Sequence, residues 1–240
     1  MSGGYAMLSP PAPTVLRRSS DMREVIFWGG TGQARVLNEC LFGTDNKIVA
    51  VFDNTSTPPP FPDVPFHVGE SGFRFWMKSR TGGNDTYFLV AVGGQERLKL
   101  HDWLVDEGLL PLTVIHRAAY VAADATLGPG CQILAHATVC AQARLERSVI
   151  VNTAASVDHE CRIGAGAHIG PGVRLAGRVT VGERAFIGAG AVILPRLTIG
   201  RDAIIGAGAV GIADVPARAV VMGVPARILS NRSQQPPAPS

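Results

Sequence analysis

The sequence is poor in charge, in aromatic residues and in long apolar runs. Only 17% of its 240 residues are charged and 6% are aromatic, and the formal net charge is +3. No run of lysines and arginines marks a surface for nucleic acid or an anionic membrane. No apolar stretch approaches the roughly 20 residues that a membrane-spanning helix requires. The small excess of positive charge suits small anionic ligands, such as nucleotides.

The four cysteines lack the spacing of a metal or redox motif. The N-terminus also lacks the order of a secretory signal, because Arg17 and Arg18 follow its short apolar segment instead of preceding it. We therefore expect a cytoplasmic protein. Residues 1–21 are expected to form a disordered leader, with Met1 or Met22 as the natural start, and residues 230–240 a disordered tail.

Glycine is abundant, with 28 residues, and much of it belongs to a repeat of six. Counting by six from Ile115, sixteen consecutive hexads begin with Ile, Val or Leu, and the fifth position is small or aliphatic from Ala119 to Ala209. Neither the helical period nor the strand period produces this spacing. The repeat predicts a β-helix over residues 115–229, with three hexads per coil and about five coils. Cys131 and Cys161 are expected to point into its interior as small apolar residues.

Residues 22–114 show a different pattern, in which apolar strands alternate with amphipathic helices. The predicted strands are Val25–Trp28, Ile48–Phe52 and a third within residues 86–94, and the predicted helices cover Ala34–Leu41, Phe73–Ser79 and Gln95–Glu107. Alternating strands and helices indicate a small parallel sheet, and hence a Rossmann-like α/β domain.

A glycine turn follows the first predicted strand and opens a helix. Backbone N–H groups at a helix N-terminus form a phosphate site, and Asp53 lies where a ribose-binding carboxylate is expected. The full dinucleotide fingerprint is missing, because Arg35 occupies its third glycine position. The pattern favours a single nucleotide or a nucleotide-sugar over a dinucleotide, and a turn that serves only strand–helix packing is the alternative.

His159 is the most prominent polar residue of the repeat. As the third residue of its hexad it is expected at a prism edge, with Glu160 placed to orient its imidazole. One coil further on lies Gly177, which leaves room for a ligand beside the histidine. His168 is expected to face outward on a prism side. An inert surface histidine is the alternative interpretation of His159.

A metal site and a cysteine nucleophile are weaker alternatives. His136, His159 and His168 occupy different hexad positions and do not converge in the manner of a three-histidine zinc site, so we expect no metal. Cys161 is expected to be buried and unactivated.

Five segments together resemble one family of enzymes. The segments are "GGTGQ", "AVGGQERLK", "VNTAASVDHECRIGAGAHIGPGVRLAG", "ILPRLTIG" and "GVPARIL". They are similar to the hexapeptide-repeat nucleotide-sugar N-acetyltransferases, of the bacillosamine and perosamine type, and to the sialic acid O-acetyltransferases. The resemblance covers roughly Glu24 to Leu229. It implies a left-handed β-helix, acetyl-CoA as co-substrate and a homotrimer.

The resemblance also assigns roles to residues. It makes His159 the catalytic base and Glu160 its partner. It places acetyl-CoA in a groove between two subunits, against His168, Gly177, Ala189, Gly206 and Ala207, and the nucleotide-sugar on Gly30, Thr31, Gly32, Asp53, Asn54 and Gly94. This chain has Gly32-Gln33-Ala34 where many relatives have Gly-His-Gly, and Asp53-Asn54 where they often have an acidic pair. Both differences lie in the nucleotide-sugar pocket, so the base and the sugar stay open.

The interpretation is therefore an N-acetyltransferase that acts on a UDP-, GDP- or dTDP-linked amino sugar. O-acetylation of a sugar such as sialic acid and a non-catalytic sugar-nucleotide-binding scaffold are the alternatives. A trimer is expected because the outward residues expected near the edge of His159 are small or apolar. They are Ala154, Ala165, Gly170, Pro171, Leu194 and Pro195. In that trimer, acetyl-CoA would contact His159 and His168 of one chain.

Overall fold

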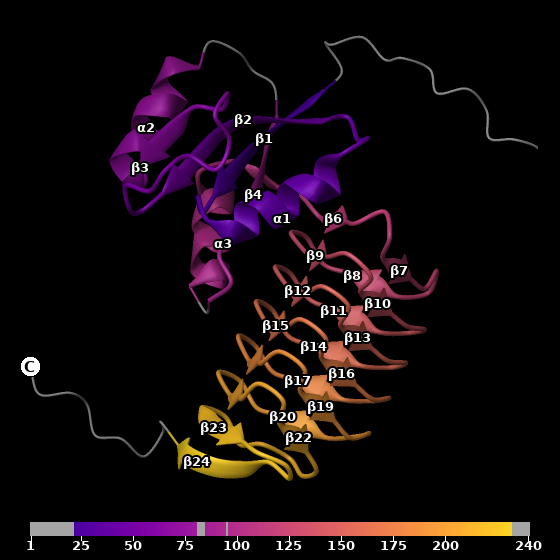
Figure 1. The fold of residues 1–240 in the computed structure, drawn as a ribbon. Helices are drawn as coiled ribbons and strands as arrows, with labels where there is room; N and C mark the ends of the chain where they lie inside the picture. Colours follow the sequence, from indigo (N-terminus) through magenta and orange to yellow (C-terminus); the bar gives the residue numbers. More distant parts are fainter. Residues whose placement is uncertain (1–21, 81–84, 95, 232–240) are drawn as a thin grey trace, which may run out of the picture.

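The computed structural model describes residues 22–80, 85–94 and 96–231. It contains an α/β domain that lies against the upper coils of a β-helix (Figure 1). The predicted leader 1–21 and residues 232–240 of the predicted tail lie outside the described residues. Residues 230 and 231 belong to strand β24, so the prediction that the tail begins at residue 230 is wrong for these two. They pair with β23, which gives their backbone a defined partner.

The α/β domain is built on a five-stranded parallel sheet. Its elements are β1 (Arg23–Trp28), α1 (Gly32–Leu41), β2 (Asn46–Asp53), β3 (Phe66–Val68), α2 (Gly69–Ser79), β4 (Thr86–Val90), α3 (Arg97–Asp106) and β5 (Leu110–Pro111). The strand order is β3-β2-β1-β4-β5. All the expected elements are present, and β3 and β5 are additional: three and two residues at the two sheet edges are too few to show an alternating pattern. The turns after β1, β2 and β4 gather at one edge of the sheet, where ligands of such sheets bind.

The β-helix is a three-sided prism, with one strand of each coil on each side. The first face contains β6 (Val114–Ile115), β9 (Gln132–Ile133), β12 (Ile150–Val151), β15 (His168–Ile169), β18 (Phe186–Ile187), β21 (Ile204–Ile205) and β23 (Ala219–Met222), followed by the antiparallel β24 (Arg227–Asn231). The second face contains β7 (Tyr120–Val121), β10 (Thr138–Val139), β13 (Ser156–Val157), β16 (Arg174–Leu175), β19 (Val192–Ile193) and β22 (Val210–Gly211). The third face contains β8 (Thr126–Leu127), β11 (Arg144–Leu145), β14 (Arg162–Ile163), β17 (Thr180–Val181) and β20 (Thr198–Ile199).

The hexad pattern fills the prism as expected. First-position aliphatic residues and fifth-position small residues form one continuous buried cluster from Cys131 to Val221. Ile115, in the first coil, is exposed, because no coil lies above it. From Gly130 to Gly208 the fourth position of each hexad has a positive φ, close to 58° at Glu160, for example. Glycine adopts this conformation without steric cost, and it occupies five of these positions: Gly130, Gly166, Gly172, Gly190 and Gly208.

Arg97 of α3 joins the two domains. Its side chain is 0% exposed, and it donates hydrogen bonds to carbonyl oxygens only. On the β-helix the acceptors are Ser148 at 3.0 Å, Gly166 at 2.6 Å and Ala167 at 3.0 Å. On the loop after β4 they are Val92 at 3.3 Å, Gly93 at 3.2 Å and Gly94 at 3.5 Å. Burial lowers the pKa of Arg97 to about 10, so the guanidinium stays charged at neutral pH.

Polar side chains of the first face complete this contact. Gln132 is buried, and its Nε2 donates to the carbonyl of Val90 at 2.7 Å, while its Oε1 accepts from Gln33 at 3.3 Å. The carboxyl-end loops of the α/β sheet are therefore fixed against the β-helix by directed hydrogen bonds as well as by apolar contact.

We predict that Arg97→Lys destabilises the protein by about 2–3 kcal/mol, because one ammonium cannot serve carbonyl groups of two domains and leaves several of them unpaired. Urea denaturation measures the change. Arg147→Lys is the matched control. Arg147 of the β-helix pairs with Asp102 of α3 at 3.0 Å, but both side chains are about half exposed. Loss of this ion pair should therefore cost less than about 1 kcal/mol. Equal effects of the two substitutions would contradict the role given to Arg97.

Candidate active site

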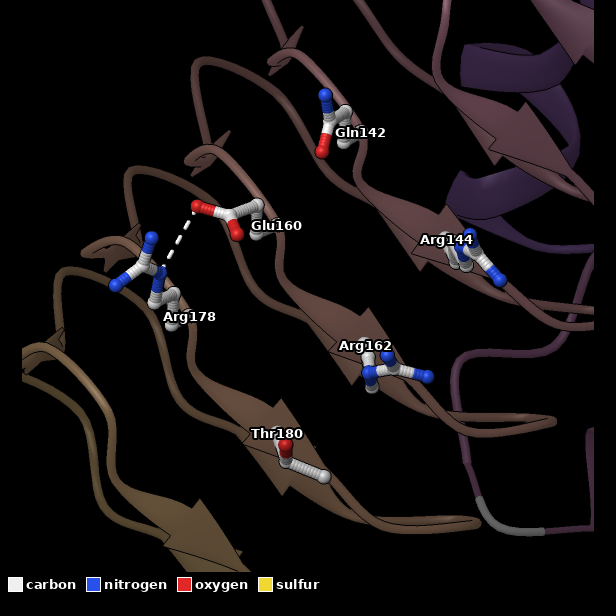
Figure 2. Close-up of a pocket in the computed structure, with 6 residues that line it drawn as sticks. All are labelled: Gln142, Arg144, Glu160, Arg162, Arg178 and Thr180. Atoms are coloured by element: carbon white, nitrogen blue, oxygen red, sulfur yellow. Dashed lines mark hydrogen bonds and ion pairs between the residues drawn. The ribbon is translucent and has the colours of Figure 1, made fainter.

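His159, Glu160 and Arg178 lie together on the prism edge between the second and third faces. His159 and Glu160 occupy the turn between β13 and β14, and Arg178 occupies the same turn one coil further on. The Nδ1 of His159 is 3.0 Å from Oε2 of Glu160. That oxygen also accepts from Nε of Arg178 at 2.9 Å (Figure 2). The predicted position of His159 at an edge, with Glu160 as its neighbour, agrees with this geometry.

The contact with Glu160 determines which ring nitrogen of His159 carries the hydrogen. A carboxylate can only accept, so Nδ1 carries the hydrogen and Nε2 keeps its lone pair. Hydrogen bonds from Arg178 and His159 lower the pKa of Glu160, which keeps it ionised. The His159 side chain is 52% exposed. An exposed imidazole with a free Nε2 and an anionic neighbour can accept a proton.

Gly177 lies directly under the imidazole. A methyl group built on Gly177 would come within 2.6 Å of Cε1 of His159. Only a residue without a side chain fits there, as the sequence spacing indicated. Within the described part of the chain, the N–H of Gly177 donates to no acceptor. It is therefore available to a ligand beside Nε2.

His168 has a different environment. It faces outward from the first face, as predicted, but the α/β domain covers it, and it is only 8% exposed. Its Nδ1 is 2.7 Å from the carbonyl of Gly93 and its Nε2 is 3.1 Å from Nδ2 of Asn152. Burial lowers the pKa of His168 to about 4, so it is neutral at physiological pH, with Nδ1–H donating to Gly93.

The glycines of the turn after β1 differ in what surrounds them. A Cβ on Gly29 would collide with the carbonyl of Ala91, and one on Gly30 would collide with Phe66, so these two glycines are required by packing. Gly32 has open space around it, with nothing within 4 Å, and it is exposed at the start of α1. Packing explains Gly29 and Gly30, whereas at Gly32 the space is free for a ligand.

Asp53 is an internal partner of this turn. Burial alone would raise its pKa, but hydrogen bonds from the N–H of Gly30 at 2.7 Å and from Thr55 hold the pKa below its usual value. The N–H of Gly30 is thus already occupied, so any phosphate at this turn would meet the N–H groups of the first turn of α1 instead. Thr31 and Asn54 are exposed beside it.

The predicted site residues form three groups. Gly30, Thr31, Gly32, Asp53, Asn54 and Gly94 gather at the carboxyl edge of the α/β sheet, which touches His168 through the loop after β4. His159, Glu160 and Gly177 lie on the edge opposite the first face. His159 and His168 are nine residues apart, and strands that pair across neighbouring coils are 18 residues apart, so the two histidines are half a coil from each other. One chain thus presents the two histidines on different sides of its prism, whereas the expectation was that both contact one acetyl-CoA.

The remaining predicted acetyl-CoA residues lie on a third location. Ala189, Gly206 and Ala207 occupy the edge between the first and second faces, in consecutive coils. The expected apolar surround of His159 is also divided among edges. Leu194 and Pro195 share its edge, whereas Ala154, Gly170 and Pro171 lie between the first and second faces, and Ala165 is buried between the third and first. A six-residue period assigns a hexad position but not the side of the prism.

Two residues that the sequence analysis did not single out take part in these groups. Arg178 shares Glu160 with His159, and Asn152 occupies Nε2 of His168. Arg178 lies 18 residues after Glu160, so counting one full coil could have found it.

Neither a cysteine nor a metal cluster competes with this arrangement in the described part of the chain. Cys161 is buried, its thiol lies 3.2 Å from the carbonyl of Ala176, and burial raises its pKa to about 11. Between residues 22 and 231, apart from the gaps at 81–84 and 95, no three His, Cys, Asp or Glu side chains are grouped to hold a metal ion. In the same ranges, no helix is long and apolar enough to cross a membrane.

Comparison with known proteins gives a consistent picture. The family model described as "Bacterial transferase hexapeptide (six repeats)" matches residues 178–210. The chain is similar to PerB from Caulobacter crescentus, solved with CoA and GDP-perosamine: 36% identity over 86% of this chain and 97% of that one, with a TM-score of 0.79. A perosamine N-acetyltransferase variant from the same organism, with a histidine replaced by asparagine, gives a TM-score of 0.80 at 36% identity and the same coverage.

A second relative is the acetyltransferase domain of PglB from Neisseria gonorrhoeae, solved with acetyl coenzyme A. It is 32% identical over 87% of this chain and the whole of that domain, with a TM-score of 0.78. The matches to PerB and to the PglB domain cover 86% and 87% of this chain, so the likeness extends over the α/β domain as well as the β-helix, whereas the family model matches 33 residues.

We predict that Gly177→Ala lowers kcat by about a hundred-fold while leaving the melting temperature nearly unchanged. The added methyl group must displace the imidazole, and an exposed imidazole can rotate away at little cost in stability. Steady-state kinetics and thermal unfolding measure the two effects. Gly172→Ala is the control: a methyl group there meets nothing closer than 4.0 Å, and its positive φ of 67° is close to the 57° that Ala154 adopts in the same turn one coil earlier. A Gly177→Ala enzyme with normal kcat would contradict the placement of His159 in the reaction.

Proposed function

The chain belongs to the family of nucleotide-sugar N-acetyltransferases with hexapeptide repeats, and from this premise we propose that His159 is the base that deprotonates the amine of a nucleotide-linked amino sugar. The protein is an acetyl-CoA-dependent sugar N-acetyltransferase, which excludes the non-catalytic scaffold considered from the sequence. The named relatives are N-acetyltransferases, which favours an amine over a hydroxyl as acceptor. The observation that carries the proposal is the free Nε2 of His159 over Gly177, with Glu160 on the other ring nitrogen.

The chemistry needs no covalent enzyme intermediate. The neutral amine attacks the thioester carbon of acetyl-CoA, a C–N bond forms, and Nε2 of His159 takes the proton that the nitrogen loses. The unpaired N–H of Gly177 stabilises the oxyanion of the tetrahedral intermediate. The C–S bond then breaks, and the CoA thiolate leaves and takes up the proton. Glu160 stabilises the imidazolium that exists between the two proton transfers.

The amino sugar and acetyl-CoA are held by two subunits. The predicted nucleotide-sugar residues lie beside the first face, and His159 lies on the opposite edge of the same prism. A nucleotide-sugar bound at Gly32 therefore reaches the His159 of a neighbouring chain and not its own. A closed ring of three subunits brings each His159 edge to the first face of the next subunit and forms three equal clefts.

The same arrangement accounts for the divided acetyl-CoA residues. Gly177 comes from the His159 edge of one subunit, whereas His168, Ala189, Gly206 and Ala207 come from the first face, and its edge with the second, of the next. Acetyl-CoA lies between them. The nucleotide base and the sugar are to be identified with a panel of UDP-, GDP- and dTDP-linked amino sugars, in which thiol release from acetyl-CoA is measured. GDP-perosamine, the ligand bound in PerB, is the first member to test.

We predict that His159→Asn lowers kcat by about 10²- to 10⁴-fold, because it removes the general base. Glu160→Gln keeps a hydrogen-bond acceptor at Nδ1 but loses the charge, so its loss is smaller. Thiol release from acetyl-CoA measures both. His136→Asn, which replaces another histidine at a hexad turn, is the control and keeps full activity. Turnover near the wild-type value in His159→Asn would rule out the proposed base.

Mixed subunits test the divided site. Gly32→Glu places a carboxylate in open space where the nucleotide is proposed to bind, so it should fold but not turn over. We predict that His159→Asn and Gly32→Glu, each inactive alone, regain activity when co-refolded in equal amounts. In randomly assembled trimers, roughly one quarter of the clefts combine the intact His159 of a Gly32→Glu chain with the intact Gly32 of a His159→Asn chain. Refolding a chain that carries both substitutions with itself gives the background. No recovery in the mixture would show that each chain carries a whole site.

A further inference from the structure

Two arginines lie side by side on the third face without an anionic partner. Arg144 on β11 and Arg162 on β14 are paired in register on neighbouring coils, and both are exposed (Figure 2). Neither side chain makes a hydrogen bond or ion pair with any described residue. Like charges directly opposite each other on neighbouring strands destabilise a sheet. The pair is thus a local concentration of positive charge that folding does not require.

The nearby carboxylates do not neutralise this pair. Glu160 is held by Arg178 and His159. Glu146 accepts from the N–H of Ala165 at 3.0 Å, so its carboxylate is directed to the far edge of the face. Glu183, which with Glu146 lines the adjoining hollow, is paired with Arg184. Since none of these acids pairs with Arg144 or Arg162, an anion that reaches the third face meets both guanidinium groups.

The surface around the two arginines is concave. One hollow of about 280 Å³ is lined by Gln142, Arg144, Glu160, Arg162, Arg178 and Thr180, and an adjoining one of about 580 Å³ shares Arg144, Arg162 and Thr180. The smaller hollow begins at Glu160, the partner of the proposed base. A ligand group bound there lies next to the reaction centre.

We propose that Arg144 and Arg162 form a phosphate-binding subsite for a substrate of the transfer reaction. The proposal rests on the proposed function, in which both substrates carry a diphosphate. Guanidinium groups bind phosphate oxygens in pairs, which is why a planar fork suits this position better than an ammonium group. Gln142 and Thr180 add neutral donors to the same hollow.

Two sources can supply the phosphate. In the divided site, the third face of one subunit lies beside the His159 edge that meets the neighbouring α/β domain, so the diphosphate of the nucleotide-sugar passes close to it. The other source is acetyl-CoA, which carries a diphosphate and a 3′-phosphate. The chemistry that the arginines recognise is the same in both.

The experiment compares Arg144→Gln, Arg162→Gln and the double variant with the wild type. Arg117→Gln is the control, because Arg117 is an exposed arginine of the first coil outside the third face. Calorimetry measures the affinity for CoA, 3′-dephospho-CoA, GDP and UDP at low and high salt, and kinetics with acetyl-CoA and the best amino sugar of the panel give KM and kcat. Thermal unfolding confirms that each variant folds, and removal of the like charges should keep or raise the melting temperature.

The expected result is a loss of affinity of about ten- to a hundred-fold for one substrate class in the double variant, with a matching rise in its KM and kcat nearly unchanged. Salt should weaken wild-type binding more than that of the double variant. A loss with CoA assigns the site to CoA, and the 3′-phosphate is its ligand if 3′-dephospho-CoA is unaffected. A loss with GDP or UDP assigns it to the nucleotide-sugar.

Unchanged affinity for all four probes would overturn the proposal. So would a change in assembly mass, measured by light scattering, with affinities unchanged, because the arginines would then serve subunit contact. The calorimetric measurements need no turnover. A wild-type protein that binds CoA but transfers no acetyl group would therefore refute the proposed function and leave the subsite testable.

Discussion

The buried guanidinium of Arg97 fixes how the α/β domain lies on the β-helix. Its acceptors are backbone carbonyls of two domains, which have no freedom to move without breaking the turns that hold them. A charged group without a carboxylate partner is stable there only because every donor direction is filled. This contact places the loop of Gly93 on His168 and so brings the nucleotide edge of the sheet to the first face of the prism. The positions of all the proposed substrate contacts depend on it.

The geometry of the prism then separates the groups that the reaction must bring together. Half a coil lies between His159 and His168, and a closed prism filled with Val, Ile and Ala cannot let a ligand through. Catalysis by one chain alone would need a substrate that wraps around the fold. In the proposed oligomer, each subunit presents the proposed base on one side and the proposed nucleotide edge on the other. The closed prism that the repeat builds is thus the reason for proposing an active site shared between subunits.

The charged and titratable groups near the His159 edge differ in whether they have a partner of opposite charge. Glu160 is shared by a histidine and an arginine, so it stays ionised whatever the state of the imidazole. Arg144 and Arg162, one strand away, have no such partner. His168, buried on the other side, is held neutral. Two histidines nine residues apart therefore differ in exposure and in hydrogen-bond partners, and the proposal gives them different roles for that reason.

The sequence by itself determined the prism, the inward Cys131 and Cys161, the edge position of His159 and its partner Glu160. These follow from local rules, since a hexad fixes each residue as inward, outward or at a turn, and strand–helix alternation fixes a parallel sheet. Only the tertiary structure decided which side of the prism each position belongs to, that His168 is buried, and that Asp53 is bonded to Gly30. It also decided that Arg97 bridges the domains. These features depend on how the two domains pack against each other. No sequence pattern predicts that contact, because its hydrogen-bond acceptors are backbone carbonyls, which every residue carries.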